Sequence, residues 1–261
     1  MQLDDIGSAL KLSDAEGWNQ SKKDWKLFLE NDGNVGMVAV CGSRVVGTTT
    51  AINYSNHVAW IGMVLVDKDY RGRGISKALL TRVLKKLEGC KSIKLDATPA
   101  GQQVYKQLDF RDEYLIARMT ISSLKDFSFF ENGSHLPELV HNNDHPQLIA
   151  LDENCFGANR AKLIGSLLKY FPGKAWMLKQ NNTITGFVLG RDGNRYHHIG
   201  PVAALSCNDA KMLIATALKR LIGEPVVVDV PEDKEELISW LTAVGFTKQR
   251  QFTRMFRKEN P

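Results

Sequence analysis

Residues 60–87 predict a strand, a glycine turn and a helix in immediate succession. An apolar run of strand length, residues 61–66, is followed by a polar turn with Gly72 and Gly74 and then by an amphipathic helical pattern. The two glycines allow the backbone to turn sharply and approach a ligand closely, and Arg71 and Arg73 add positive charge beside them. The helix would direct its free N–H groups and the positive end of its dipole into this turn. The stretch therefore predicts a binding site for a diphosphate.

Two common glycine-rich motifs do not fit the turn. A dinucleotide fingerprint would need glycine where Lys77 stands, and a Walker A loop would need a Gly-Lys-Ser/Thr ending that is absent. Residues 71–76 (Arg-Gly-Arg-Gly-Ile-Ser) instead resemble the Arg/Gln-x-x-Gly-x-Gly/Ala loop of the GCN5-related N-acetyltransferases (GNATs), with Ser76 in place of the usual last small residue. The resemblance implies acetyl-CoA (coenzyme A) as cosubstrate.

In this family the strand before the loop binds the pantetheine arm. The resemblance implies pantetheine pairing by Val66 and a hydrogen bond from the Val64 N–H to the thioester carbonyl. The expected cofactor-binding residues are Met63, Val64, Leu65, Val66, Arg71, Gly72, Arg73, Gly74, Ile75 and Ser76.

The first half of the chain has the order of elements expected for this family. A helix is predicted over residues 5–16, and Ser21 and Asp24 form a capping box for a second helix. Residues 35–41 and 44–53, rich in β-branched side chains, predict a hairpin around Gly42. Later strands are expected at residues 60–66 and 92–97, a short helix at residues 100–108, and one or two final strands over residues 110–121. Two helices, three strands, helix, strand, helix, strand is the order of the GNAT fold.

The second half repeats the first. Residues 199–202 (Ile-Gly-Pro-Val) match residues 61–64 (Ile-Gly-Met-Val), and Arg254-Met255 matches Arg118-Met119, at offsets of 138 and 136. We therefore predict an α/β (α+β) fold of two tandem GNAT-like domains, each a mixed, mostly antiparallel sheet with a splayed central parallel pair and flanking helices. The expected division is a catalytic domain over residues 1–124, a polar linker over residues 125–136 and a degenerate domain over residues 137–261.

The two copies differ where the chemistry is expected. The counterpart of the glycine turn, residues 205–210, contains no glycine, and its Asp209 would repel phosphate. Leu241 stands at the position of Tyr105. The second domain is therefore not expected to bind coenzyme A in the usual way.

Tyr105 is the predicted catalytic acid. Residues 105–110 resemble the family's Tyr-x-x-x-Gly-Phe helix ending, with Asp109 replacing the glycine, and the resemblance implies that the Tyr105 hydroxyl protonates the departing thiolate. A half-buried structural tyrosine is the alternative. The general base is open, because Trp60 stands where histone-type members carry a carboxylate. Asp96 is the candidate base, although it could equally cap the turn that follows it; His57 is a weaker candidate, and water could take the proton instead.

The acceptor is expected to bind beside the loop between the first two helices. The predicted substrate-binding residues are Trp18, Asn19, Gln20 and Trp60, although Trp18 could simply pack within a helix connector. The aromatic residues and the missing carboxylate favour a small-molecule primary amine. The alternatives are a protein lysine or N-terminal acetyltransferase, a non-catalytic acyl-CoA sensor, and a partner-binding scaffold.

Composition sets the remaining expectations. A hydrophobic fraction of 43% and a charged fraction of 24% are typical of a globular protein, and a net charge of +5 is too small to argue for nucleic acid. The four cysteines are widely spaced, so neither a metal site nor a disulfide framework is expected. The sequence has neither a basic leader nor an apolar run of membrane-spanning length. We expect a cytoplasmic monomer or weak homodimer without membrane or nucleic-acid partners.

Overall fold

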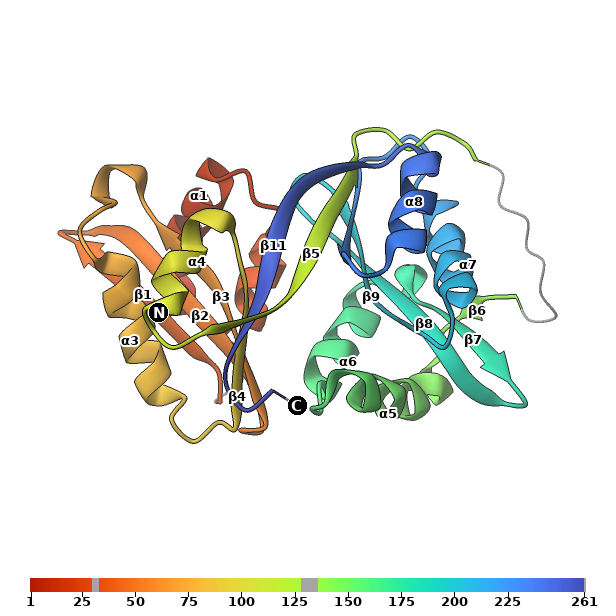
Figure 1. The fold of residues 1–261 in the computed structure, drawn as a ribbon, viewed down its shortest axis with the longest axis horizontal. Coiled ribbons are helices and arrows are strands. Elements are labelled where there is room, and N and C mark those ends of the chain that lie inside the picture. Colours follow the sequence, from red (N-terminus) through yellow and green to blue (C-terminus); the bar gives the residue numbers. More distant parts are fainter. Residues whose placement is uncertain (30–32, 128–135, 261) are drawn as a thin grey trace. The chain divides into compact units, whose positions relative to one another are not determined.

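The computed structural model describes residues 1–29, 33–127 and 136–260. The chain forms two compact units, the first built from two separate segments of the sequence and the second from one continuous segment (Figure 1). Unit 1 comprises Met1–Tyr114 together with Thr253–Pro261, and unit 2 comprises Leu115–Phe252. Both are mixed α/β structures with mostly antiparallel sheets, as the sequence predicts.

The helices and strands of the first half follow the predicted order, and those of the second half repeat it after an additional short strand at residues 138–139. Those of the first half are α1 (Ile6–Ala15), α2 (Lys22–Leu27), β1 (Val35–Cys41), β2 (Arg44–Tyr54), β3 (Val58–Val66), α3 (Ile75–Lys86), β4 (Ser92–Ala97), α4 (Pro99–Lys106) and β5 (Arg111–Ile121). Those of the second half are β6 (Glu138–Leu139), α5 (His145–Phe156), α6 (Ala161–Tyr170), β7 (Trp176–Gln180), β8 (Thr183–Asp192), β9 (His197–Ala204), α7 (Cys207–Leu218), β10 (Val226–Pro231), α8 (Glu235–Val244) and β11 (Thr247–Lys258).

Local sequence signals account for several of these boundaries. The predicted capping box is present at α2, where the Ser21 side chain accepts a hydrogen bond from the Asp24 N–H and the Asp24 carboxylate accepts one from the Ser21 N–H. Thr98 caps α4, which begins at Pro99, a residue suited to the first helical turn. Gly42, with a φ of +61°, lies in the turn between β1 and β2.

Each sheet has a separate hydrophobic core on either face. In unit 1, α3 and α4 cover one face with residues such as Leu80 and Tyr105, and α1 and α2 cover the other with residues such as Ile6 and Trp25. In unit 2, α7 and α8 cover one face and α5 and α6 the other. The same layering in both units confirms the predicted duplication.

The final strand of each repeat lies in the sheet of the other repeat. Residues 253–258 of β11 pair antiparallel with β4 in unit 1, and residues 116–121 of β5 pair antiparallel with β10 in unit 2. Met255 is fully buried in the unit 1 core, and Met119, its partner in the sequence repeat, is fully buried in the unit 2 core. The two halves have therefore exchanged their last strands.

Two equivalent ion pairs accompany the exchange. The Arg254 guanidinium donates to both carboxylate oxygens of Asp96 on β4, at 2.9 and 3.1 Å. The Arg118 guanidinium donates to both oxygens of Asp229 on β10, at 2.7 Å each. Arg118 and Arg254 are the residues matched by the sequence repeat, so each repeat supplies the arginine that pairs with an aspartate of the other.

The division into contiguous domains at residues 1–124 and 137–261 remains a prediction about the sequence. The compact units are defined by contacts between residues instead. By that measure, the end of β11 belongs to unit 1 and most of β5 belongs to unit 2. Most of the predicted linker, residues 125–136, lies outside the described residues, which resume at Leu136.

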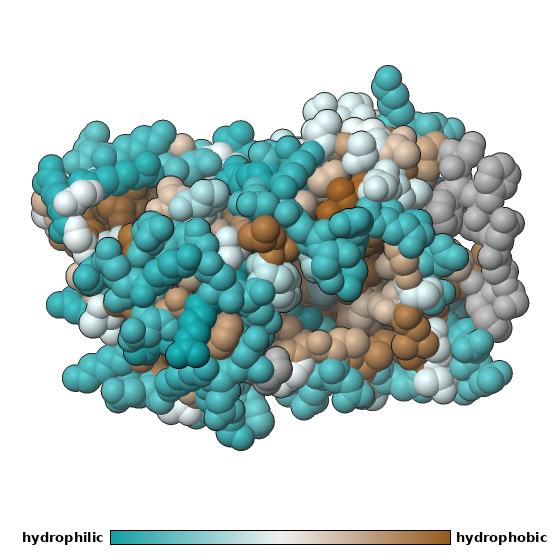
Figure 2. Space-filling model, in the orientation of Figure 1, coloured by the Kyte–Doolittle hydropathy of each residue, from teal (hydrophilic) through white to brown (hydrophobic). Residues whose placement is uncertain are grey.

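The surfaces of the units differ in hydropathy. Unit 1 presents a largely hydrophilic surface on the face drawn in Figure 2, whereas unit 2 shows more hydrophobic residues there. The exposed large hydrophobic side chains follow the same trend, with Leu3 and Val40 in unit 1 and Leu115, Leu136, Leu139, Tyr170, Leu205 and Ile222 in unit 2. Over the described parts of the chain, none of the helices combines the length and apolar character needed to cross a bilayer.

Candidate active site

The site begins with a bulge in β3. The β2–β3 register shifts between Thr48 and Thr50, so that Met63 and Val64 lie opposite Thr49 alone. Met63 has a φ of +52°, a conformation uncommon outside glycine. The Thr48 hydroxyl donates to the Met63 carbonyl at 2.7 Å, and the Thr50 hydroxyl donates to the Gly62 carbonyl at 3.1 Å. These buried hydroxyls hold the bulge in one conformation.

The two parallel strands of unit 1 are paired only at their beginnings. Val58, Ala59 and Trp60 of β3 pair with residues 92–94 of β4, and the described pairing stops there. From Ile61 to Val66, the β3 edge facing β4 is left without a neighbouring strand in the described structure. This is the splayed parallel pair predicted from the sequence, and it leaves the backbone of Val64 and Val66 next to the opening.

The turn after β3 leaves the start of α3 open. Gly72 and Gly74 both have a φ of +74°, and a Cβ atom added to either would meet no other atom within 4 Å. Gly74 is the N-cap residue of α3 and supplies no side-chain hydrogen bond to the first turn. Ile75 packs over Gly47, and Ser76 is half-buried. The helix start is thus anchored by packing, while its N–H groups have no side-chain cap.

The two arginines of the turn are exposed. The Arg71 guanidinium lies 2.5 Å from the Glu16 carboxylate and also donates to the Val66 carbonyl at 3.2 Å. The Arg73 guanidinium donates to the Asp69 carbonyl at 3.0 Å and lies 4.9 Å from the centre of the Tyr70 ring. The Arg71–Glu16 ion pair lies at the surface and is weak, and the contacts of Arg73 leave its charge unbalanced, so both cations are available to an arriving anion.

Tyr105 is buried at the end of α4. Its ring meets Phe110 edge to face, with 6.0 Å between the ring centres, and contacts Gly101. Burial raises the pKa of the Tyr105 hydroxyl to about 12, because the charged phenolate would be poorly solvated there. The hydroxyl is therefore protonated at neutral pH, the form that a general acid requires.

Asp96 is held by a guanidinium. Besides the two hydrogen bonds to Asp96, Arg254 lies 4.6 Å from the Trp60 ring centre and donates to the Tyr114 hydroxyl. Burial would lower the pKa of Arg254, but the Asp96 carboxylate outweighs it and the net shift is upward. The pKa of Tyr114 is raised by burial. Asp96 and Trp60 are thus brought together, with both oxygens of the predicted base already engaged.

The predicted acceptor loop follows α1. The Trp18 side chain packs against the core under α1 and α2, and the Trp18 backbone N–H donates to the Ser13 carbonyl at 2.9 Å. Asn19 is buried. The Gln20 side-chain oxygen is also buried, and no hydrogen-bond donor reaches it within the described structure. A buried acceptor without a donor is uncommon, and it suits a ligand that carries N–H groups.

Several residues of this site were not predicted. The Thr48–Thr50 hydroxyls support the bulge, Arg254 pairs with Asp96, and Lys94 and Glu113 form a half-buried ion pair at 3.1 Å. The second Glu113 oxygen is buried and lacks a partner among the described residues. Polar residues inside predicted strands, such as the threonine run and Lys94, were the available signal for some of them. Nothing in the sequence near Asp96 pointed to Arg254.

Unit 2 has the same framework without the open helix start. The β8–β9 register also shifts, with Gly200 and Pro201 opposite Leu189, and β9 pairs with β10 over only three residues. The Ser206 hydroxyl caps α7 by accepting from the Asp209 N–H at 3.1 Å, and it donates to the Asp209 carboxylate at 2.7 Å. An anion at α7 would have to displace a cap and approach a carboxylate.

A metal centre finds no support in the described residues. Across residues 1–29, 33–127 and 136–260, no group of three or more His, Cys, Asp and Glu side chains is arranged to hold a metal ion.

Comparison with known sequences places the same kind of domain in both halves. Residues 7–110 match the profile described as the acetyltransferase (GNAT) family, and residues 148–261 match the profile described as an acetyltransferase (GNAT) domain. The Bacillus subtilis protein YitH, named as an uncharacterized N-acetyltransferase, is 22% identical over 93% of this chain and 85% of its own length. An enzyme of a Pseudoalteromonas species named holothin acyltransferase is 24% identical over 95% and 83%. An acetyltransferase of Yersinia pestis is 30% identical over 37% of this chain and 71% of its own length.

Solved structures share the two-unit fold. A candidate acetyltransferase from Pyrococcus horikoshii superposes with a TM-score of 0.79 at 22% identity, covering 100% of this chain and 88% of that one. A tandem GNAT protein from the clavulanic acid biosynthesis pathway superposes with a TM-score of 0.67 at 13% identity, covering 99% and 96%.

Proposed function

The chain belongs to the GNAT acetyltransferase family, and from that premise we propose that unit 1 transfers an acetyl group from acetyl-CoA to a primary amine of a small molecule. The observation that carries the proposal is the uncapped start of α3, flanked by two left-handed glycines and two exposed arginines. The equivalent position in unit 2 has none of these features.

The residues present fit the expected cosubstrate. The diphosphate would lie against the first N–H groups of α3, beside Arg71 and Arg73, where no side chain competes for those donors. The pantetheine arm would pair with the free β3 edge at Val66. Leu65 faces the core and Met63 forms the bulge, so these two residues fix the position of the edge.

Acetyl-CoA, when bound, supplies an activated acetyl thioester. The Val64 N–H belongs to the bulge, and its proposed role is to donate a hydrogen bond to the thioester carbonyl oxygen. One such donor is typically worth about 3 to 4 kcal/mol in the transition state. The threonine hydroxyls that fix the bulge would hold this donor in place before the reaction, which is the condition for electrostatic stabilisation.

Tyr105 is the proposed acid. Its buried hydroxyl holds a proton at neutral pH and can donate it to the leaving sulfur. Asp96 remains the proposed base, but both of its oxygens already accept hydrogen bonds. Because Arg254 occupies both of its oxygens, Asp96 would have to exchange one of those hydrogen bonds for the amine. Loss of the amine proton to water needs no such exchange.

The acceptor is proposed to be a small amine bound near Gln20 and Trp60. The unpaired Gln20 oxygen can accept a hydrogen bond from an amine N–H, and the ring of Trp60 would flank the acceptor beside Arg254. A relative that aligns over nearly the whole chain is named for a single compound, holothin, which supports a small-molecule acceptor over a protein.

The test combines binding and turnover. We expect acetyl-CoA to bind the intact protein with one site by isothermal titration calorimetry, and thiol release to depend on an added amine across a panel of small amines and lysine peptides. Binding without turnover by any amine would favour a sensor, and turnover of peptides alone would favour a protein acetyltransferase. Absence of acetyl-CoA binding would overturn the proposal.

A further inference from the structure

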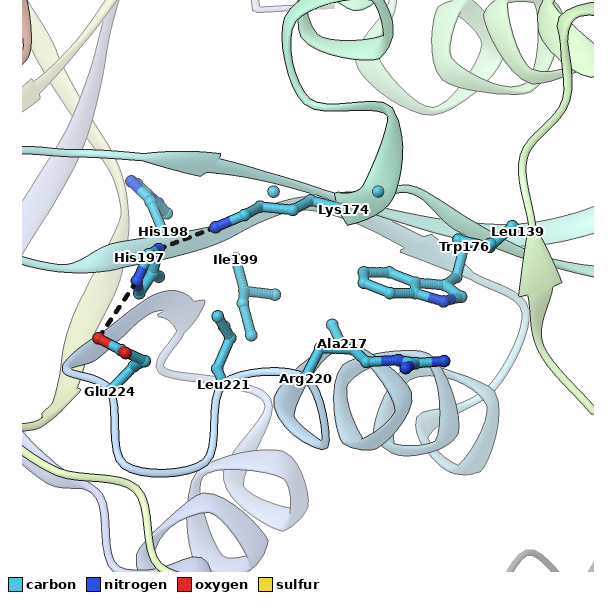
Figure 3. A pocket seen from close by; sticks show the side chains of 12 residues that line it. Leu139, Lys174, Trp176, His197, His198, Ile199, Ala217, Arg220, Leu221 and Glu224 are labelled. Carbon is cyan, nitrogen blue, oxygen red and sulfur yellow. Dashed lines mark hydrogen bonds and ion pairs between the residues drawn. The ribbon is translucent and has the colours of Figure 1, made fainter.

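Unit 2 contains a cavity of about 550 Å³. Its lining comes from the segment before β7, from β7, β8 and the start of β9, and from the last turn of α7 and the loop after it (Figure 3). The volume lies within the range of about 300 to 1,000 Å³ that is typical of small-molecule sites.

This cavity is not the counterpart of the acetyl-CoA site. That counterpart would lie at the first turn of α7, beside Ser206, and at the β9 bulge formed by Gly200 and Pro201. The cavity instead lies at the other end of α7, next to Ala217 and Leu221. An α-helix rises 1.5 Å per residue, so the length of α7 separates the two ends by about 18 Å.

One side of the cavity is apolar. Figure 3 shows the side chains of Trp176, Ile199 and Leu221 lying between the strands and the loop after α7. All three are at least 90% buried and belong to the core under α7, so they form a fixed wall. The indole of Trp176 offers a flat surface suited to an aromatic ring.

A hydrogen-bonded group of charged side chains forms the opposite end. The Lys174 ammonium contacts the Asp192 carboxylate and lies 2.8 Å from Nδ1 of His197. Nδ1 of His197 is 2.6 Å from Asp192, and its Nε2 is 3.6 Å from Glu224 (Figure 3). The charge of Lys174 is therefore already balanced by a carboxylate.

Arg220 differs from Lys174, because the Arg220 guanidinium makes no ion pair with any described residue. It is exposed at the mouth of the cavity, and Figure 3 shows its side chain extended below Trp176. Because Asp192 already balances Lys174, Arg220 is the lining cation that remains available to pair with an anionic ligand. An unpaired arginine presents a fork of N–H donors that matches a carboxylate.

We propose that this cavity binds a small aromatic carboxylate, with its ring against Trp176 and its carboxylate paired with Arg220. The carboxylate would pair with the guanidinium of Arg220, and a flat ring would fill the apolar side. The site is separate from the acetyl-transfer site and does not depend on the proposed function.

The test uses the intact protein with indole-3-acetate and 2-naphthoate as probes, and their neutral amides as matched controls. We expect at least one acid to bind one site by isothermal titration calorimetry and to shift the methyl NMR signals of Ile199 and Leu221. Arg220→Gln should weaken binding by about tenfold or more, since one charge-assisted pair is lost. Lys162→Gln, an equal charge change at an exposed residue of α6, should leave it within about twofold.

A second variant tests the cavity itself. Gly173 borders the cavity, and a Cβ atom added there would meet no atom within 4 Å, so Gly173→Leu should fold normally and occupy part of the space. We expect it to abolish binding of the acid. The proposal is overturned if neither acid binds, if an acid and its amide bind equally, or if Arg220→Gln leaves the affinity unchanged.

Discussion

Helices α3 and α7 occupy the same place in the two units, but their first turns are opposite in kind. α3 begins at the left-handed Gly74, has no side-chain cap and follows two arginines. α7 begins at Ser206, which caps the helix and holds the carboxylate of Asp209 beside it. The N–H groups at the start of a helix can therefore either bind a ligand or be capped by a side chain that stabilises the helix. The first arrangement is open in α3, and the second is present in α7.

The rest of the framework is common to both units. Each unit has a bulge in one strand (β3 or β9), a short parallel pairing of that strand with the next (β4 or β10) and a core on both faces of its sheet. These features position backbone and bury apolar area, so they are needed whether or not the unit is catalytic. The comparison indicates that the same packing supports the fold of both units, although the first turns of α3 and α7 differ.

The largest expected effect is the loss of the exchanged strand. Deleting residues 253–261 removes every β11 residue that pairs with β4 and the fully buried Met255, a loss of about 2 to 5 kcal/mol from that side chain alone. We expect unit 1 to unfold and acetyl-CoA binding to disappear, although unit 2 keeps its core. Hydrogen exchange across β4 and β10 would measure this.

The matched control deletes only residues 259–261, which follow β11. It should change the melting temperature by less than about 3 °C. Normal exchange protection of β4 in the longer deletion would contradict the exchange of strands.

The second prediction compares Tyr105 with Leu241. Tyr105→Phe should lower kcat by about 100-fold, the lower limit for a general acid, and leave the dissociation constant of acetyl-CoA within about twofold. Leu241→Ala should instead reduce the free energy of unfolding by about 2 to 5 kcal/mol, since Leu241 is fully buried, and leave kcat of the folded enzyme unchanged. Steady-state kinetics and urea denaturation separate the two. A kcat for Tyr105→Phe equal to wild type would show that Tyr105 is structural.

The third prediction concerns the two helix starts directly. Gly74→Val forces a β-branched residue to a φ of +74° next to the open N–H groups, so acetyl-CoA binding should weaken by about 10 to 100-fold. Ser206→Ala removes the cap of α7 and should cost about 1 kcal/mol of stability without affecting that binding. Calorimetric titration of both variants with acetyl-CoA measures the two effects. Equal losses of binding would contradict the proposal that only the start of α3 binds the cosubstrate.

The smallest expected effect is a pH dependence that resides in unit 2. Burial, helped by the facing Arg191 and Arg118 and opposed by Asp229, lowers the pKa of His198 from 6.5 to about 3. His198 thus stays neutral in the folded state and becomes protonated only on unfolding. The contribution of neutral His198 to the free energy of unfolding is complete above pH 6.5 and is lost as the pH falls toward 3. Between pH 6.5 and 5, the free energy of unfolding should fall by about 1 to 2 kcal/mol for this reason.

Urea denaturation at several pH values would measure this loss, and His198→Gln should reduce it. The lowered pKa of Asp229 adds a further loss only below its usual value of 3.8. An unchanged pH dependence in the variant would show that His198 is not the group responsible.

Much of the fold could be predicted because its signals are local. The capping box at Ser21 and Asp24, the turn at Gly42 and the alternation of helical and strand patterns are set by neighbouring residues. The glycine turn was recognisable for the same reason. The side chains around Asp96 were not, because Arg254 is 158 positions away and no local pattern connects them.

The sequence by itself determined the duplication, the order of elements and the difference between the two helix starts, all of which depend on residue type at short spacing. Only the tertiary structure decided which sheet receives each final strand, because Arg118-Met119 and Arg254-Met255 are equivalent in sequence and fit either position. It likewise decided the placement of Trp60 and Tyr114 beside Arg254 and the cavity beside Trp176. Long-range pairing is set by the packing of whole surfaces, which the local pattern of side chains does not contain.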